Sequence, residues 1–171
     1  SIARKVSTIH SFYRYLVREN QLTADPLAGV RPPKRERRLP TVLNNKQIES
    51  VIQAVEGDNP QNLRDRAILE LMYAAGIRLG ELVGLDLGGL DLDDQTVRVW
   101  GKGNKERMVP LGRAAVSALE CYLEKGRGHL AKEKVEKALF LNRDGGRLSR
   151  RSVELLVRKY AMRAGLDDRV F

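Results

Sequence analysis

An arginine at a helix junction and a lysine in a glycine-rich turn are the residues of this sequence best suited to chemistry on a phosphate group. Arg78 lies between an apolar helical run, residues 63–75, and a second short run that begins at Leu79. Glu81 follows three residues after Arg78, which is within reach of the guanidinium if the second run is helical. An arginine held in this way presents its remaining donors outward, in a planar fork that matches a phosphate.

A plainer interpretation of Arg78 stays open at this point. An Arg–Glu pair at the start of a helix is most often a surface ion pair that contributes less than about 1 kcal/mol to stability. The second motif favours the phosphate interpretation, because Gly101 and Gly103 flank Lys102 and leave little side-chain bulk to block a phosphate backbone. A charged hairpin tip is also commonly just exposed to solvent, so this turn alone does not decide the matter.

The pattern of apolar residues predicts a mainly α-helical chain with a small antiparallel β-hairpin. The predicted helices are residues 2–19, a helix capped by Asn44 or Asn45, residues 63–75, 79–85, 114–124 and 129–137, and a last helix capped by Ser149 that ends at Gly165. Residues 96–100 alternate as a strand, residues 107–110 are its partner, and residues 101–106 form the turn between them. Residues 86–94 are expected to form a loop, and residues 138–141 a short buried strand or extended segment.

Composition indicates a polyanionic partner. The 171 residues include 31 Lys and Arg against 22 Asp and Glu, a net charge of +9, which points first to nucleic acid. No run reaches the roughly 18 apolar residues that a membrane span needs. One cysteine excludes an internal disulfide and fits a reducing, cytoplasmic location. His10 and His129 lie near no cysteine cluster, so neither a zinc site nor another metal is expected.

The chain divides into three parts by composition. Residues 1–20 form one amphipathic helix, and residues 21–43 form a basic linker in which four prolines prevent a continuous helix. Residues 44–171 contain the other predicted elements. The basic side of the first helix, with Arg4, Arg14 and Arg18, is suited to a phosphate backbone, although an ordinary solvated face has the same pattern.

The runs GIRLGELVGL at residues 76–85 and VRVWGKGNKERMVPL at residues 97–111 resemble the catalytic domain of the tyrosine recombinases, above all the Xer-type enzymes and related phage integrases. The resemblance extends over essentially the whole chain. It implies part of a catalytic domain, residues 44–171, preceded by the last helix of a helical core-binding domain and a linker that follows DNA. It also implies site-specific DNA recombination through a 3′-phosphotyrosyl intermediate, without metal or cofactor, on double-stranded DNA and beside a partner recombinase subunit. No membrane and no small-molecule substrate is expected.

The resemblance also implies roles for individual residues. Arg78 and Lys102 match catalytic positions, with Arg78 stabilising charge and Lys102 protonating the leaving oxygen, and Glu81 would hold Arg78. Arg151 matches a position that can read a base in the major groove, although an ordinary solvated arginine is the alternative there. The full set of expected DNA-binding residues is Lys105, Arg107, Arg150, Arg151, Arg4, Arg14, Arg18 and Arg35.

Several catalytic groups of the family have no match in the sequence. A histidine–arginine motif, a His or Trp position and a nucleophilic tyrosine would follow residue 171, and Tyr13, Tyr15, Tyr73, Tyr122 and Tyr160 are all in unsuitable positions. We therefore expect that this polypeptide alone, as a monomer, does not cleave DNA. A DNA-binding module or regulator without catalysis remains an alternative, as does a basic RNA-associated scaffold.

Overall fold

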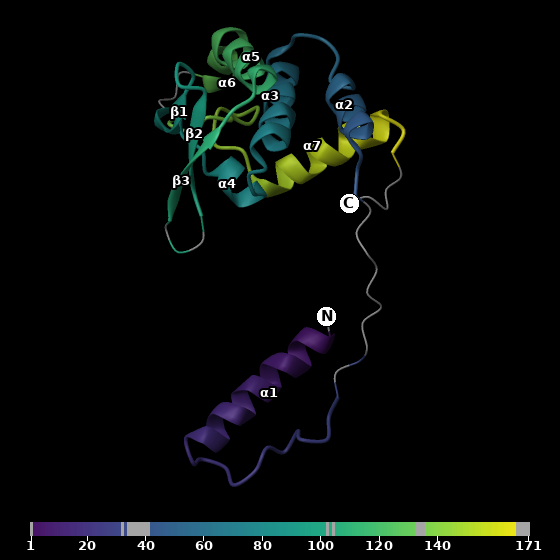
Figure 1. Ribbon diagram of the computed structural model, residues 1–171, viewed down its shortest axis with the longest axis vertical. Coiled ribbons are helices and arrows are strands. Elements are labelled where there is room, and N and C mark those ends of the chain that lie inside the picture. Colours follow the sequence, from purple (N-terminus) through teal and green to yellow (C-terminus); the bar gives the residue numbers. More distant parts are fainter. Residues whose placement is uncertain are drawn as a thin grey trace. The chain divides into compact units, whose positions relative to one another are not determined.

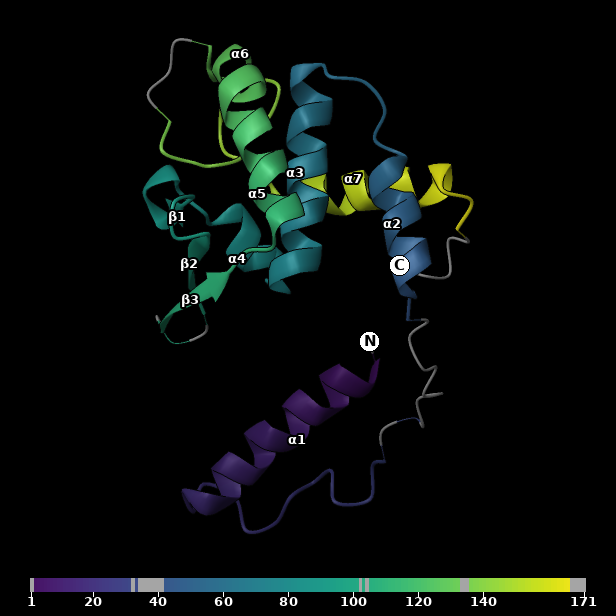
Figure 2. The same cartoon turned by 45° about the horizontal axis from the view of Figure 1, so that its top comes forward.

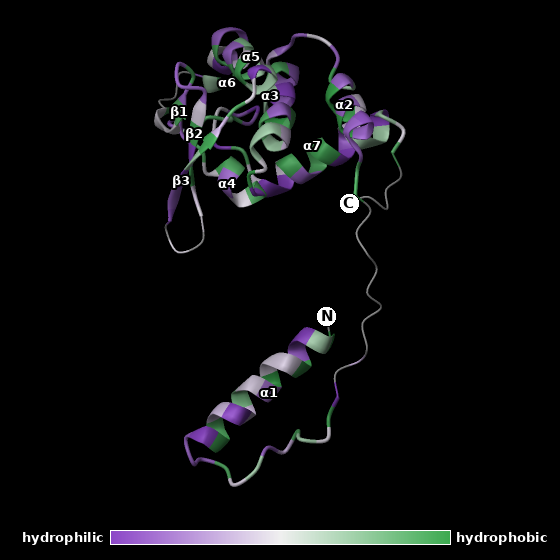
Figure 3. Ribbon diagram, in the orientation of Figure 1, coloured by the Kyte–Doolittle hydropathy of each residue, from purple (hydrophilic) through white to green (hydrophobic). Residues whose placement is uncertain are grey.

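The computed structural model describes residues 2–31, 33, 42–101, 103, 105–132 and 136–166, and it forms two compact units, Ser1–Pro40 and Thr41–Phe171 (Figure 1). The first unit contains α1 (Ile2–Arg18), in which no residue is buried and along which apolar and polar residues both recur (Figure 3). Turns follow α1, and the His10 ring Nε2 donates to the carbonyl of Val30 at 2.8 Å, which fastens the returning chain to the helix.

The second unit is mainly helical with a small antiparallel sheet, as predicted. Its elements are α2 (Asn45–Gln53), α3 (Pro60–Ala75), α4 (Leu79–Val83), a 3-10 turn η1 (Leu87–Gly89), β1 (Leu90–Asp91), β2 (Thr96–Trp100), β3 (Glu106–Pro110), α5 (Arg113–Cys121), a π-helical turn η2 (Tyr122–Arg127), α6 (Gly128–Ala131) and α7 (Arg150–Arg163). Helices α3 and α5 lie side by side, and α7 runs from α4 to α2 (Figures 1 and 2).

Side-chain caps define the helix ends, as the sequence predicts. Asn44 accepts from the Gln47 backbone N–H at 2.9 Å while the Gln47 side chain accepts from the Asn44 N–H at 2.9 Å, a complete capping box. Ser149 caps α7 through the N–H of Ser152. Helix α3 ends at Gly76, whose φ of +54° is the left-handed conformation that favours glycine. This ending turns the chain directly into Arg78.

The sheet has three strands in the order β1–β2–β3, all antiparallel. The predicted hairpin is present, with Thr96 opposite Pro110 and Trp100 opposite Glu106. The third strand was not predicted. Its two residues, Leu90 and Asp91, lie within the segment expected to be a loop, and only their pairing with β2 makes them a strand.

The predicted helix over residues 129–137 is wrong at residues 132, 136 and 137, and residues 133–135 lie outside the described residues. The helical path that starts at α5 continues through η2 and ends at Ala131, because Lys132 adopts a left-handed φ of +44°. Residues 136 and 137 are not helical, and residues 138–141 are extended, with bridges from Ala138 to Asp86 and from Leu141 to Arg147. The charged composition of residues 129–137 favoured a helix. The residues that follow, 138–141, pair in an extended form with the chain beyond α4.

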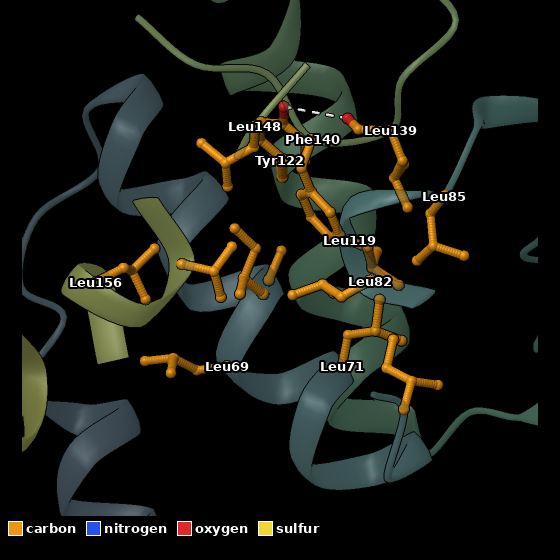
Figure 4. Close-up of a cluster of buried hydrophobic side chains, with 14 of the residues drawn as sticks. Leu69, Leu71, Leu82, Leu85, Leu119, Tyr122, Leu139, Phe140, Leu148 and Leu156 are labelled. Carbon is orange, nitrogen blue, oxygen red and sulfur yellow. Dashed lines mark hydrogen bonds between the residues drawn. The ribbon is translucent and has the colours of Figure 1, made fainter. Parts of the chain in front are cut away.

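Leucines from α3, α4, α5 and α7 gather in one apolar core that also includes Tyr122 (Figure 4). The Tyr122 hydroxyl is buried with them, where it donates to the Leu139 carbonyl at 3.3 Å and accepts from the Leu141 N–H at 3.2 Å. Burial raises the pKa of Tyr122, so the hydroxyl remains protonated and can make both bonds. The core therefore includes the extended segment as well as the helices.

A second buried polar group joins α3 to α7. The Asp65 carboxylate, 4% exposed, accepts from Arg64 at 3.0 Å and 2.7 Å through Oδ1 and from the Tyr160 hydroxyl at 3.0 Å through Oδ2. Burial and the adjacent Asp65 charge raise the pKa of Tyr160 to about 12, which keeps it a donor. The network fixes α7 against the central helix.

Replacing Tyr160 by Phe should lower the free energy of unfolding by about 1–3 kcal/mol, because it removes a donor from the buried Asp65 carboxylate. Urea unfolding followed by circular dichroism measures the change. Tyr73→Phe is the matched control, since Tyr73 is 47% exposed and should lose almost nothing. Equal stabilities for the two variants would contradict the role given to the network.

Candidate active site

A buried carboxylate, Glu81, is the centre of the candidate site. Its side chain is 5% exposed, and each of its oxygens accepts two hydrogen bonds. Oε1 accepts from Arg78 Nη1 at 3.0 Å and from Arg107 Nη1 at 2.9 Å. Oε2 accepts from the Arg78 backbone N–H at 2.9 Å and from Arg107 Nη2 at 2.8 Å. Four donors compensate the cost of removing this charge from water.

The four donors hold the carboxylate in its charged form. Hydrogen bonds from Arg107 and from the Arg78 backbone lower the pKa of Glu81 from 4.5 to about 2, in opposition to burial, which raises it. The same ion pair raises the pKa of Arg107. The site therefore keeps its two cations and its anion over the whole physiological range of pH.

Arg78 is held at its backbone and one guanidinium nitrogen, while the rest of its side chain faces solvent. It precedes the first residue of α4 with an extended backbone, ψ 151°, and Glu81 reaches back to it from the third position of the helix. The contact predicted between these two residues is therefore present. The Arg78 side chain is 75% exposed in spite of this contact, so its other donors remain available to a ligand.

Arg107 joins the hairpin to α4. It lies on β3, opposite Val99, and its two terminal nitrogens bind both oxygens of Glu81. The sequence predicted a DNA contact for Arg107 and missed this bidentate pair. The alternation of β3 could have placed Arg107 on one face of the hairpin, but nothing in the sequence indicated that α4 lies at that face.

A surface hollow of about 420 Å³ opens at this junction. It is lined by Arg78, Gly80, Glu81, Trp100, Gly101 and Arg150. These residues come from α4, from the end of β2 and from the start of α7, so three separate segments meet at one place. The predicted residues Arg78, Glu81 and Arg150 come together here, whereas Gly80 and Trp100 were not predicted.

The turn predicted to carry a catalytic lysine begins at the hollow. Lys102 itself lies outside the described residues, but the Gly101 N–H donates to the Lys105 carbonyl at 2.8 Å and closes the base of the turn. A Cβ atom on Gly101 would lie 3.7 Å from Oε1 of Glu81, so the start of the turn lies close to the buried carboxylate. Gly103 has a φ of +79°, which favours glycine there.

The other predicted DNA-binding residues lie on the surface of their own units. Lys105 is exposed, and Arg151 is 72% exposed beside Glu154, at 3.4 Å. In the first unit, Arg4, Arg14 and Arg18 are exposed on α1, and the Arg18 guanidinium lies 5.6 Å from the centroid of the Tyr15 ring. Arg35 lies outside the described residues.

The described parts of the chain contain no candidate metal site. There, His, Cys, Asp and Glu residues form no group of three or more that could hold a metal ion. Within the same residues, no helix combines the length and the apolarity of a membrane span.

Replacing Glu81 by Gln should lower the free energy of unfolding at neutral pH by about 1–2 kcal/mol, a value reduced for the exposure of both arginines. The folded pKa near 2 lies below the ordinary 4.5, so the carboxylate's advantage is complete above about pH 4.5 and is lost as pH falls towards 2. Urea unfolding of wild type and variant at several pH values measures the difference. The exposed Glu106, changed to Gln, is the control, and a difference independent of pH would contradict the assignment.

Known proteins resemble this chain in both sequence and fold. Residues 41–171 match the phage integrase family. The tyrosine recombinase XerC of Natranaerobius thermophilus is 46% identical over 172 residues, which cover 98% of this chain and 57% of that protein. A crystal structure of XerA recombinase aligns with a TM-score of 0.67 at 24% identity, over 99% of this chain and 57% of that one. XerH recombinase bound to palindromic difH substrate, in a post-cleavage complex, aligns with a TM-score of 0.64 at 25% identity. The alignment covers 76% of this chain and 38% of that one.

These matches confirm the resemblance that the two sequence motifs indicated. The chain spans 57% of the length of the XerC relative. With the family pattern matched over most of its residues, the chain is a member of the phage integrase family and a relative of the Xer tyrosine recombinases.

Proposed function

We propose that this chain is the DNA-binding and partly catalytic portion of a site-specific tyrosine recombinase. The observation that carries the proposal is the arginine pair on Glu81, which leaves the Arg78 side chain 75% exposed at a hollow lined by a second arginine. A fixed cation with free donors is what a reaction at a phosphodiester requires, because negative charge develops on the phosphate oxygens. The tyrosine recombinase names of the relatives support the same proposal.

In the proposed reaction, a tyrosine hydroxyl attacks a DNA backbone phosphate, forms a 3′-phosphotyrosyl bond and releases a 5′ oxygen. Arg78 binds the phosphate and stabilises its developing charge. Lys102 donates a proton to the leaving 5′ oxygen as a general acid. Glu81 orients Arg78, and through Arg107 it also holds the hairpin from which Lys102 extends.

Double-stranded DNA is the proposed partner, together with a second recombinase subunit on the same DNA. Lys105, Arg150 and Arg151 would contact DNA from the second unit, and the basic residues of α1 and Arg35 would contact it from the first. In this proposal residues 1–20 are the last helix of a core-binding domain, residues 21–43 the linker and residues 44–171 a part of the catalytic domain. A cytoplasmic location fits such a protein.

One observation favours a DNA-binding module without catalysis as the second candidate. Tyr122 and Tyr160 are fully buried, and Tyr73 lines an apolar groove with Leu69, Met72 and other residues, separate from the hollow at Arg78. None of these three tyrosines of the second unit lies where it could attack a phosphate bound by Arg78. The nucleophile of the proposed reaction must come from elsewhere than this unit's described residues.

Replacing Arg78 by Ala should weaken binding of the 171-residue chain to duplex DNA by about three- to tenfold and reduce the dependence of log K on log salt by about one phosphate contact. Fluorescence anisotropy of a labelled duplex at several salt concentrations measures both quantities. Arg143→Ala is the control, because Arg143 is 84% exposed and pairs only loosely with Asp144, at 3.8 Å. Equal affinities for the two variants would argue against the phosphate role of Arg78.

The 171-residue polypeptide should bind a nicked duplex without forming a covalent adduct. The physical reason is the placement of its tyrosines, which puts no hydroxyl of the second unit's described residues at the Arg78 hollow. Denaturing gel electrophoresis of labelled DNA after incubation measures adduct formation. A labelled band that migrates with the protein and survives denaturant would contradict the prediction and remove the support for the second candidate.

A further inference from the structure

The guanidinium of Arg150 lies directly against the backbone of Gly80, at the edge of the hollow that Arg78 also lines. A Cβ atom built on Gly80 would lie 2.9 Å from Nη2 of Arg150 and 3.4 Å from its Cζ. Real Cβ atoms essentially never lie within 3.0 Å of an atom of a neighbouring element. A side chain at residue 80 would therefore force the Arg150 guanidinium to shift from this position.

Arg150 has no partner for its charge among the residues that the structure describes: none of them accepts a hydrogen bond from its guanidinium, and none of their carboxylates lies within 4.0 Å of it. Its neighbour Arg151 differs, since it pairs with Glu154 at 3.4 Å. Packing against Gly80 thus holds a cation at the hollow without neutralising it.

The one carboxylate in the lining of the hollow does not balance the arginines. Glu81 already accepts two hydrogen bonds at each oxygen, three of the four from Arg107 and the Arg78 backbone. Its single negative charge is shared between Arg78 and Arg107, and Arg107 takes both oxygens. A ligand that enters the hollow therefore meets the free donors of Arg78 and the whole guanidinium of Arg150.

We propose that Arg150 is a second phosphate-binding residue of this hollow, and that Gly80 is the residue that permits it to reach the DNA backbone beside Arg78. This inference rests on the proposed function, because it takes the ligand of Arg78 to be DNA. The chemistry of two guanidinium groups favours a phosphodiester, whose oxygens can accept from both. The hollow is open at the surface, and Trp100 also lines it.

Gly80 provides the sharpest test, because its replacement changes no charge. Gly80→Ala should displace the Arg150 guanidinium through the added Cβ atom, whereas alanine itself suits a helix better than glycine. We expect a melting temperature no lower than that of wild type, together with a three- to tenfold loss of affinity for duplex DNA (~1 phosphate contact). Gly128→Ala is the matched control, since Gly128 is also helical and a Cβ atom added there would meet no atom within 4 Å.

The measurement is fluorescence anisotropy of a labelled duplex with the 171-residue protein over a range of salt concentrations. Four proteins are compared with wild type: Gly80→Ala, Arg150→Ala, the double variant and Gly128→Ala. Arg150→Ala should lower the slope of log K against log salt by about one. The double variant should bind no worse than Arg150→Ala alone, because the alanine at residue 80 affects binding only by moving the Arg150 side chain.

The outcomes separate this inference from the proposed function. If Arg78→Ala weakens binding but Arg150→Ala leaves affinity and salt slope unchanged, Arg150 is not a phosphate ligand and only this inference fails. If Gly80→Ala weakens binding equally with and without Arg150, the glycine acts by another route, which also overturns the inference. If wild-type protein does not bind the duplex at all, the proposed function fails and this inference fails with it.

Discussion

The buried charge of Glu81 is the constraint on which the geometry of the site depends. A carboxylate that is 5% exposed is tolerated only if its lone pairs are filled by donors. Those donors come from two distant parts of the chain, Arg78 at the start of α4 and Arg107 on β3. The need to compensate one charge therefore joins the helix to the hairpin and sets the direction in which Arg78 faces solvent.

Other contacts of the second unit stabilise the chain that follows α4. The π-helical turn brings Tyr122 and Arg127 to the same extended segment, where Arg127 donates to the carbonyls of Glu136 and Ala138 at 2.6 Å and 2.7 Å. Glycine at residue 126 lets this turn pack closely, because a Cβ atom there would lie 3.0 Å from the Tyr122 ring and 3.3 Å from the Pro60 carbonyl oxygen. The extended segment in turn pairs with the chain just after α4, through the Leu139 N–H and the Leu85 carbonyl at 2.9 Å.

Positive charge is arranged in two ways on this protein. Arg64, Arg107 and Arg127 bind oxygens of the fold itself, since Arg64 donates to the Asp65 carboxylate, Arg107 to the Glu81 carboxylate and Arg127 to backbone carbonyls. Exposed arginines such as Arg78 and Arg151 keep donors for a ligand. A count of basic residues does not distinguish the two groups, so the total of 31 Lys and Arg residues overstates the number of cations that are available to a ligand.

The sequence by itself determined the elements that depend on neighbours along the chain. Asn44, Ser149 and Gly76 define helix ends through local hydrogen bonds and backbone preference, Arg78 and Glu81 meet because they lie one helical turn apart, and two short motifs indicated the family. Only the tertiary structure decided the pairing of Arg107 with Glu81, the packing of Arg150 on Gly80 and the strand β1. Each of these joins residues that are distant in sequence, or depends on a close approach between elements. Periodicity and propensity describe one segment at a time, so they do not contain the distances between segments.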